Sequence, residues 1–263
     1  MATPLGSRAE RLAAVRSLRS VKGRRERRSF AFEGTTLLRE ARAANFPIDE
    51  LYATQAIYDA TPLVRQLDAE GIPTFIIEEA VAARISDLTT PSGMVAVAPI
   101  RLTDLEEIVQ RRGTILILAD VNDPANAGTL LRSAEAFGCG DVVFGRLGVD
   151  PYHPKVVRGS MGAVFRLSLS VASPDELTPA ASSQRLHFLG LTTAGTSLAD
   201  ERWEEPVALV VGNERRGLGA WEDLCERMLA IPMAGEAESL SAGVAGSIAL
   251  YEAMRSGLVK RVV

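Results

Sequence analysis

The first segment whose residue types could do chemistry spans residues 120 to 132 and directly follows an apolar run. Asn126, Gly128 and Thr129 stand where we expect a helix to begin, and free backbone N–H groups at a helix start can bind an anion. Arg132 follows Thr129 by three residues, so both lie on one helix face. An arginine so placed can reach back toward the loop. The alternative is an ordinary capped helix with a surface arginine.

The second segment follows the apolar run 207–211 and reads Gly-Asn-Glu-Arg-Arg-Gly-Leu over residues 212 to 218. Gly212 and Gly217 permit close approach of the backbone to a ligand, and Glu214 places a carboxylate at the end of a strand. The spacing is neither a G-x-G-x-x-G fingerprint nor a Walker A loop, because no Gly-Lys-Ser/Thr follows. The alternative is an ordinary strand-to-helix turn.

The third segment runs from residue 231 to residue 241 and enters a long apolar-periodic stretch. Pro232 follows a strand pattern, the loop after it contains Gly235, and two serines stand at the expected helix start. This combination could shape a pocket for a small molecule. The alternative is a C-terminal helix with Ser239 or Ser241 as its N-cap.

A sheet must bring these three segments together. Beyond residue 113, short continuous apolar runs alternate with helical patterns, which predicts an α/β domain with a mainly parallel sheet covered by helices on both faces. Ligands of such sheets bind beyond the carboxyl ends of the strands, where the three segments lie. We expect strands at 114–119, 142–145, 165–169, 186–191, 207–211 and 228–231, and helices at 103–112, 128–137, 154–161, 175–183, 220–226 and 240–255.

The N-terminal part shows a separate, smaller α/β pattern. We expect helices at 35–44 and 61–70 and strands at 50–53, 73–77 and 94–98, closed by Pro99. The predicted organisation is therefore a basic arm at 1–28, a small α/β domain at 29–100, a linker with a first helix at 101–112, and a larger domain at 113–263.

Composition narrows the class of protein. With 263 residues, 47% hydrophobic and 24% charged, the chain has a globular composition, and its apolar runs are too short to cross a bilayer. Cys139 and Cys225 form no metal-type cluster, and we expect buried, reduced thiols in a cytoplasmic protein. His153 and His187 lie far apart, so we expect no metal site.

Charge is distributed unevenly. The net charge is −4, yet residues 8 to 28 contain nine basic side chains against two acidic ones. A basic block on an acidic body suits an arm that binds nucleic-acid phosphates. The alternative is a solvated helix face that binds no ligand.

Taken in order, the three segments resemble motifs 1, 2 and 3 of the SpoU (TrmH-like) RNA ribose 2′-O-methyltransferases. Two further stretches are similar to the family's connecting segment and to the start of its N-terminal substrate domain. The matching residues are 122–138, 211–218 and 231–245 for the motifs, 154–163 for the connecting segment, and 25–34 for the substrate domain.

The resemblance implies more than residue spacing can. It implies a C-terminal trefoil knot, a homodimer with the active site near its interface, and an N-terminal domain that resembles RNA-binding ribosomal proteins. It also implies S-adenosylmethionine as the cofactor, no metal, and methyl transfer to a ribose 2′-hydroxyl of structured RNA. Ribosomal RNA is the favoured substrate. Transfer RNA is the alternative.

The resemblance also assigns site residues. Arg132 matches the arginine that acts on the ribose, as a phosphate clamp or as a general base, and we favour the clamp; Asn126, Glu214 and Ser239 match polar residues that orient it or the ribose. The cofactor residues carried over are Thr192, Gly195, Gly212, Ile231, Met233 and Leu240. The RNA-binding residues expected are Arg24, Arg25, Arg28, Lys155 and Arg158.

One position departs from the family pattern. Motif 3 usually has Asn after Ser-Leu, and this chain has Ser241. That serine is the one feature in favour of a non-catalytic RNA-binding protein of the same fold. A nucleotide-binding oxidoreductase is a third possibility, against which the missing glycine fingerprint counts.

Overall fold

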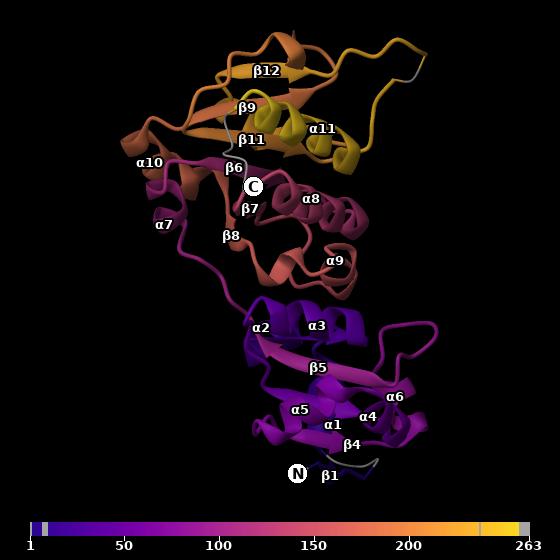
Figure 1. Ribbon diagram of the computed structural model, residues 1–263. Coiled ribbons are helices and arrows are strands. Elements are labelled where there is room, and N and C mark those ends of the chain that lie inside the picture. The colour runs from indigo at the N-terminus through magenta and orange to yellow at the C-terminus, as the bar shows by residue number, and fades with distance from the viewer. Residues whose placement is uncertain (1, 7–9, 237, 258–263) are drawn as a thin grey trace. The chain divides into compact units, whose positions relative to one another are not determined.

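The computed structural model describes residues 2–6, 10–236 and 238–257, and the chain forms two compact units (Figure 1). The first unit comprises Met1–Ile100 and Tyr152–Phe165, and the second comprises Arg101–Pro151 and Arg166–Val263. The segment 152–165 thus belongs to the first unit, although it lies between two strands of the second in the sequence.

Within the described residues, the first unit contains a five-stranded sheet of order β1-β4-β3-β5-β2. Strand β5 runs antiparallel to β2 and β3, while the β1–β4 and β3–β4 pairs are parallel. Its strands are β1 (Thr3–Pro4), β2 (Ser29–Glu33), β3 (Glu50–Ala53), β4 (Thr74–Ile76) and β5 (Met94–Pro99). Its helices are α1 (Glu10–Ser17), α2 (Val21–Arg27), α3 (Thr35–Ala43), α4 (Gln55–Ala60), α5 (Pro62–Ala69), α6 (Glu79–Ile85) and α9 (Pro154–Gly159). Strands β1 and β2 and helices α2, α4 and α6 were not anticipated.

The basic N-terminal stretch is folded into this unit and does not form a separate arm. It forms two helices, α1 and α2, with Ser20 as the N-cap of α2 accepting the N–H of Gly23. Three apolar residues of α1 and of the turn that follows it are buried: Leu12, Val15 and Leu18. They form a cluster with side chains of the sheet and of α6. Burial of three large aliphatic side chains favours folding by several kcal/mol, at about 1.5–3 kcal/mol each.

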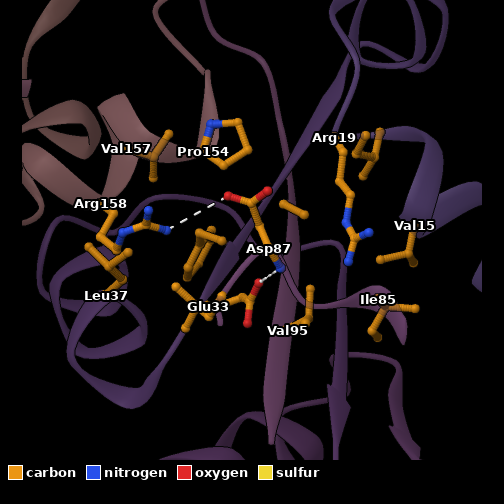
Figure 2. Close-up of a pocket in the computed structure, with 14 residues that line it drawn as sticks. Val15, Arg19, Glu33, Leu37, Ile85, Asp87, Val95, Pro154, Val157 and Arg158 are labelled. Carbon is orange, nitrogen blue, oxygen red and sulfur yellow. Dashed lines mark hydrogen bonds and ion pairs between the residues drawn. The ribbon is translucent and has the colours of Figure 1, made fainter. Parts of the chain in front are cut away.

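Helix α9 completes the first unit. The ring of Tyr152, just before α9, lies 4.5 Å from that of Phe30, and Phe165 contacts Phe32 at 5.1 Å between centroids. Figure 2 shows Pro154, Val157 and other residues around a small cavity of about 30 Å³ in this unit. The aromatic residues on both sides explain why a segment far along the sequence packs here.

The described part of the second unit contains a seven-stranded sheet of order β10-β12-β9-β11-β6-β7-β8, in which every pair is parallel. The expectation of a parallel α/β domain is confirmed. Its strands are β6 (Thr114–Ala119), β7 (Asp141–Gly145), β8 (Ser168–Ala172), β9 (His187–Thr192), β10 (Thr196–Ser197), β11 (Val207–Gly212) and β12 (Arg227–Ala230). Its helices are α7 (Leu105–Gln110), α8 (Pro124–Ala136), α10 (Pro174–Gln184) and α11 (Ala242–Arg255), with 3₁₀ turns η2 (Leu198–Asp200) and η3 (Gly219–Leu224).

Helices cover both faces of this sheet (Figure 1). All six residues of β6 are buried, as expected for a strand covered on both sides. Helices α7 and α10 pack with η3 over one face, where Trp221 is fully buried. On the other face α11 packs closely against α8. Gly246 allows this close packing, since a Cβ at that position would lie 2.4 Å from Leu130 Cδ2.

The structure corrects the expected start of α8. The helix begins at Pro124, with Asp123 as its N-cap accepting the N–H of Ala125. Proline at the first position and an aspartate before it favour this start. Gly128 and Thr129 therefore lie inside the helix, and their N–H groups are not available to an anion.

Other boundaries moved less. Strand β8 spans 168–172 where 165–169 was expected, since Ala163–Phe165 is a 3₁₀ turn (η1) of the first unit, and the expected helix at 220–226 is the 3₁₀ turn η3. Ser241 is the N-cap of α11 and accepts the N–H of Val244 at 3.3 Å. The trefoil knot stays a prediction.

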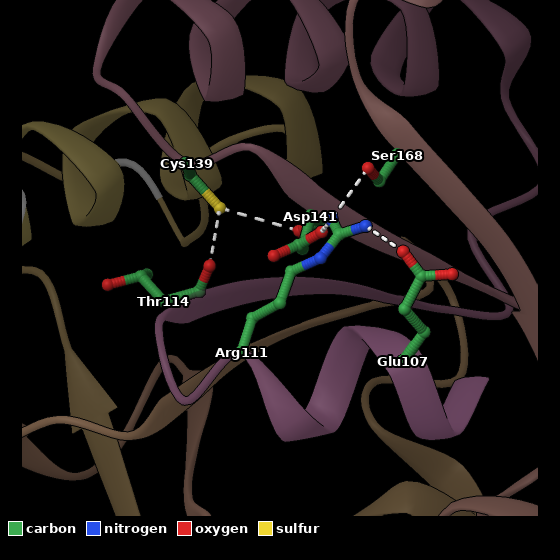
Figure 3. A network of polar contacts seen from close by, with 6 residues as sticks. All are labelled: Glu107, Arg111, Thr114, Cys139, Asp141 and Ser168. Atoms are coloured by element: carbon green, nitrogen blue, oxygen red, sulfur yellow. Dashed lines mark hydrogen bonds and ion pairs between the residues drawn. The ribbon is translucent and has the colours of Figure 1, made fainter. Parts of the chain in front are cut away.

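A polar network closes the edge of the sheet at the amino ends of β6, β7 and β8 (Figure 3). Arg111 donates to Asp141 at 2.5 Å and to Ser168 at 2.7 Å, and it pairs with Glu107. Burial raises the pKa of Asp141, and the Arg111 charge only partly offsets this. This edge is opposite to the carboxyl ends of the strands, so the network serves the fold.

Candidate active site

A cavity of about 410 Å³ opens at the carboxyl ends of β9, β11 and β12, which is within the usual range for small-molecule sites. The second and third sequence segments both contribute to its wall. Of the six carried-over cofactor residues, five line it: Thr192, Gly212, Ile231, Met233 and Leu240. Glu214 and Ser239 also line it. Gly195 does not, because it packs against the backbone of β12, where a Cβ would lie 2.4 Å from Met228 O.

The turn after β11 is held by a side chain that the sequence reasoning did not single out, Asn213. Its Oδ1 accepts the N–H groups of Arg215 and Arg216 at 3.0 and 3.2 Å, and its Nδ2 donates to Asp120 O at 2.9 Å. Asn213 and Gly217 also exchange two backbone hydrogen bonds. An asparagine next to glycine at a strand end is a known turn signal. This turn signal could have identified Asn213 from the sequence.

Close packing inside the turn explains Gly212. A Cβ at this position would lie 2.5 Å from the carbonyl carbon of Gly217. Any larger residue would push the turn away from β11 and deform the cavity wall. The glycine thus lets the backbone itself form part of the wall, and the expected close approach of this backbone to a ligand stays a prediction.

The first segment meets the other two at Asn126. The Asn126 side-chain amide donates to Glu214, 88 residues away in the sequence. On its other side, a Cβ at Gly243 of α11 would lie 2.9 Å from Asn126 Oδ1, so the glycine gives the amide its space. Residues from all three segments therefore converge on one side chain.

Arg132 lies on the exposed side of α8 and does not line the cavity. Within the described residues its guanidinium makes no hydrogen bond or ion pair with another side chain. An arginine without an internal partner keeps all five donors available for a ligand. The expected role of Arg132 at the ribose therefore stays a prediction, and no described contact commits its guanidinium to another role.

Asp120, directly after β6, ties neighbouring loops together and was also missed. It adopts a positive φ of 53° and accepts the N–H of Leu147 at 3.1 Å and Nε1 of Trp221 at 3.4 Å. An aspartate tolerates this conformation better than most residues do. Asp120 is thus a structural residue of the site's frame.

The five expected RNA-binding residues fall into different environments. Arg24 is fully buried, and its guanidinium donates to the carbonyls of Leu18 and Arg19 at 2.9 and 3.0 Å. The expectation is therefore wrong for Arg24, because a side chain that closes the end of α1 cannot contact RNA. Arg25, Arg28 and Lys155 are exposed. Arg158 is exposed too, with Asp87 3.8 Å away (Figure 2).

Other chemistry is not indicated in the described part of the chain. Residues 2–6, 10–236 and 238–257 contain no group of three His, Cys, Asp or Glu side chains placed to hold a metal ion. Burial raises the pKa of both the Cys139 and Cys225 thiols to about 12. None of the described helices is long and apolar enough to span a bilayer.

The fold and cavity define an α/β protein whose small-molecule site is built from the loops after parallel strands. Comparison with known families then identifies the class. Residues 113–251 match the SpoU rRNA Methylase family, and residues 10–96 match the MRM3-like substrate binding domain. The chain belongs to the SpoU rRNA methylase family.

Individual relatives agree with this assignment. A Streptomyces viridochromogenes protein, 23S rRNA (uridine(2479)-2′-O)-methyltransferase, is 35% identical over 65% of this chain and 63% of its own length, so the match spans less than two thirds of that relative. An uncharacterized tRNA/rRNA methyltransferase of Synechocystis is 30% identical over 92% of this chain and 89% of its own. The AdoMet-bound rRNA methyltransferase of Sinorhizobium meliloti superposes with a TM-score of 0.86 at 27% identity, covering 97% of this chain and 98% of that one.

Proposed function

We propose that this protein transfers a methyl group from S-adenosylmethionine to a ribose 2′-hydroxyl of ribosomal RNA. The observation that carries the proposal is one cavity lined by the second and third motif segments, to which the first segment is joined by the hydrogen bond from Asn126 to Glu214. The family match and the rRNA relatives supply the chemical class.

The cavity fits the cofactor. Aliphatic side chains such as Leu191, Leu229 and Ile231 suit an adenine ring, and Gly212 contributes its backbone to the wall. When bound, S-adenosylmethionine supplies a methyl group activated by its sulfonium. The chain's own task is to bring an oxygen nucleophile in line with that methyl at short range.

We assign that task to Arg132. Its guanidinium would hold a phosphate next to the target ribose in two parallel hydrogen bonds and so fix the 2′-hydroxyl. The role as a general base is less favoured, since guanidinium groups stay protonated in proteins. Asn126 and Glu214 orient the neighbouring loops, and Ser239 lines the cavity near its mouth.

We further propose a homodimer. Arg132 does not line the cavity of its own chain, so a site that uses it needs either RNA-induced movement or a second copy. Helix α11 also exposes Val244 and Tyr251, at 46% and 44% of their full surface. Exposed apolar residues next to a site are typical of an interface.

The first unit is proposed to bind the RNA, because it contains the exposed arginines of α1 and α2 and matches a substrate-binding domain. We propose a cytoplasmic location, where ribosomal RNA and S-adenosylmethionine are both available.

The test is transfer of labelled methyl from S-adenosylmethionine to ribosomal RNA lacking the modification, followed by mapping of ribose methylation. The expected result is one or a few methylated riboses in ribosomal RNA, lost with Arg132→Ala. Methylation confined to transfer RNA would overturn the assignment of substrate. Binding of RNA without transfer to any RNA would overturn the assignment of activity.

A further inference from the structure

Two charged side chains line the cavity but have no role in the function proposed above. Arg216 and Glu222 both line the cavity with their neighbours Glu214 and Leu218. Glu214 is engaged by Asn126. Within the described residues, neither the Arg216 guanidinium nor the Glu222 carboxylate forms a side-chain hydrogen bond or an ion pair, including with each other.

The backbones of Arg216 and Glu222 are both held in place by neighbouring residues. Arg216 is the fourth residue of the turn that Asn213 holds, and its own N–H donates to Asn213 Oδ1. Glu222 lies in η3 next to Trp221, whose side chain is fully buried. The side chains can therefore adjust to a ligand while their backbones stay in place, which limits the ordering cost of binding.

The two charges have opposite sign and face the same cavity. A ligand that offers one carboxylate and one ammonium on adjacent atoms could satisfy both at once, through charge-assisted hydrogen bonds. S-adenosylmethionine has such a pair at its amino-acid end. A lone anion or a lone cation would leave one of the two side chains without a partner.

We infer that Arg216 binds the carboxylate, and Glu222 the ammonium, of the amino-acid end of S-adenosylmethionine. The assignment rests on the proposed function and adds a subsite to it. The aliphatic wall at Leu191, Leu229 and Ile231 is left for the adenine. Two residues to which the resemblance assigned no role thereby decide which adenosine derivatives the cavity retains.

The chain offers matched control residues. Arg215 is the exposed neighbour of Arg216 and has its N–H on the same Asn213 oxygen, yet it does not line the cavity. Asp223 stands in the same relation to Glu222, being exposed and outside the wall. The test pairs are therefore Arg216→Gln with Arg215→Gln, and Glu222→Gln with Asp223→Asn.

The first experiment measures the dissociation constants of S-adenosylhomocysteine and methylthioadenosine by calorimetry. These ligands share the adenosine and sulfur, and only the first has the amino-acid end. We expect Arg216→Gln and Glu222→Gln each to weaken S-adenosylhomocysteine about tenfold and methylthioadenosine less than twofold. Arg215→Gln and Asp223→Asn should change neither.

A second pair of ligands separates the two charges. Decarboxylated S-adenosylmethionine lacks only the carboxylate, so wild-type protein should bind it about tenfold more weakly than S-adenosylmethionine. That difference should vanish in Arg216→Gln and persist in Glu222→Gln. Because each comparison is a ratio within one variant, a general loss of folded protein does not imitate the result.

Two outcomes overturn the subsite. One is unchanged S-adenosylhomocysteine affinity in Arg216→Gln and Glu222→Gln. The other is an equal loss for methylthioadenosine, which would indicate a deformed cavity. Reduced RNA affinity with unchanged cofactor affinity in Arg216→Gln would assign that arginine to RNA instead. If wild-type protein bound neither S-adenosylmethionine nor S-adenosylhomocysteine, the proposed function itself would fail.

Discussion

Asn126 Nδ2 lies 2.5 Å from Glu214 Oε1, and this hydrogen bond joins the loop after β6 to the loop after β11. The two residues are far apart in sequence but on adjacent strands, because β6 and β11 pair in parallel from Val207 against Thr114 to Gly212 against Ala119. Their contact is thus a consequence of strand order. It aligns the helix that presents Arg132 with the wall of the cavity.

The first prediction concerns this pair. We expect Asn126→Ala and Glu214→Ala each to lower the methyl-transfer rate by about 10- to 100-fold, because either change frees the loop that positions the ribose. The double variant should lose little more than either single one, since both break the same bond. Single-turnover kinetics at saturating cofactor measure this. Losses that simply multiply would show that the two side chains act independently.

The second prediction concerns Arg132. Arg132→Ala should abolish measurable transfer while the dissociation constant of S-adenosylmethionine stays within about threefold, because the side chain is outside the cavity. Arg132→Lys should restore a small part of the rate, since lysine keeps the charge and loses the two-pronged geometry. Calorimetry measures the dissociation constant, and methyl-transfer assays on the same preparations measure the rate. A large loss of cofactor affinity in Arg132→Ala would refute the assignment.

The third prediction concerns the basic helices of the first unit. Deleting residues 1–28 is an unsuitable test, because Leu12, Val15 and Leu18 belong to the core. We expect the double variant Arg25→Ala, Arg28→Ala to weaken RNA binding and to reduce the slope of log K against log salt by about 1 to 2. Filter binding at several salt concentrations measures the slope. An unchanged slope would remove these two arginines from the interface.

The fourth prediction separates Arg24 from its exposed neighbours. Arg24→Ala should lower the free energy of unfolding by about 2–4 kcal/mol, because two carbonyls lose their charged donor and a buried side chain is removed. Arg25→Ala, at an exposed site, should change it by less than about 0.5 kcal/mol. Urea unfolding monitored by circular dichroism gives both values. Equal stability of the two variants would contradict the structural role of Arg24.

The fifth prediction uses the thiol pKa values. Burial raises the pKa of Cys139 and Cys225 to about 12, so at pH 8 both are protonated and poorly nucleophilic. A thiol reagent should therefore react slowly with native protein and rapidly with two thiols after denaturation. Raising the pH toward 10 in the native state should accelerate labelling by about tenfold per pH unit, because the thiolate fraction grows in that proportion below the pKa, while the absolute rate stays low. Fast labelling at pH 8 would show that a thiolate is accessible.

The sequence by itself determined the elements whose cause is local. The buried apolar run Thr114–Ala119 had to be a covered strand, and Ser173 with Glu176 forms the capping box that starts α10. The parallel sheet follows from alternation of such runs with helices. The family, the cofactor and the three motif segments were recognisable for the same reason, since their residues are contiguous in the chain.

Contacts between distant segments were beyond the sequence. Tyr152 and Phe165 pack against Phe30 and Phe32 of the first unit. The segment 152–165 therefore belongs to the first unit, although the residues before and after it belong to the second. Arg24 looked like its exposed neighbours, yet the short turn between α1 and α2 directs it inward to two carbonyls. The hydrophobic periodicity and the residue types of a segment indicate the structure of that segment alone. The burial of its side chains depends on which other elements pack against it. Only the tertiary structure decided which arginines are free to meet RNA and which charges line the cavity.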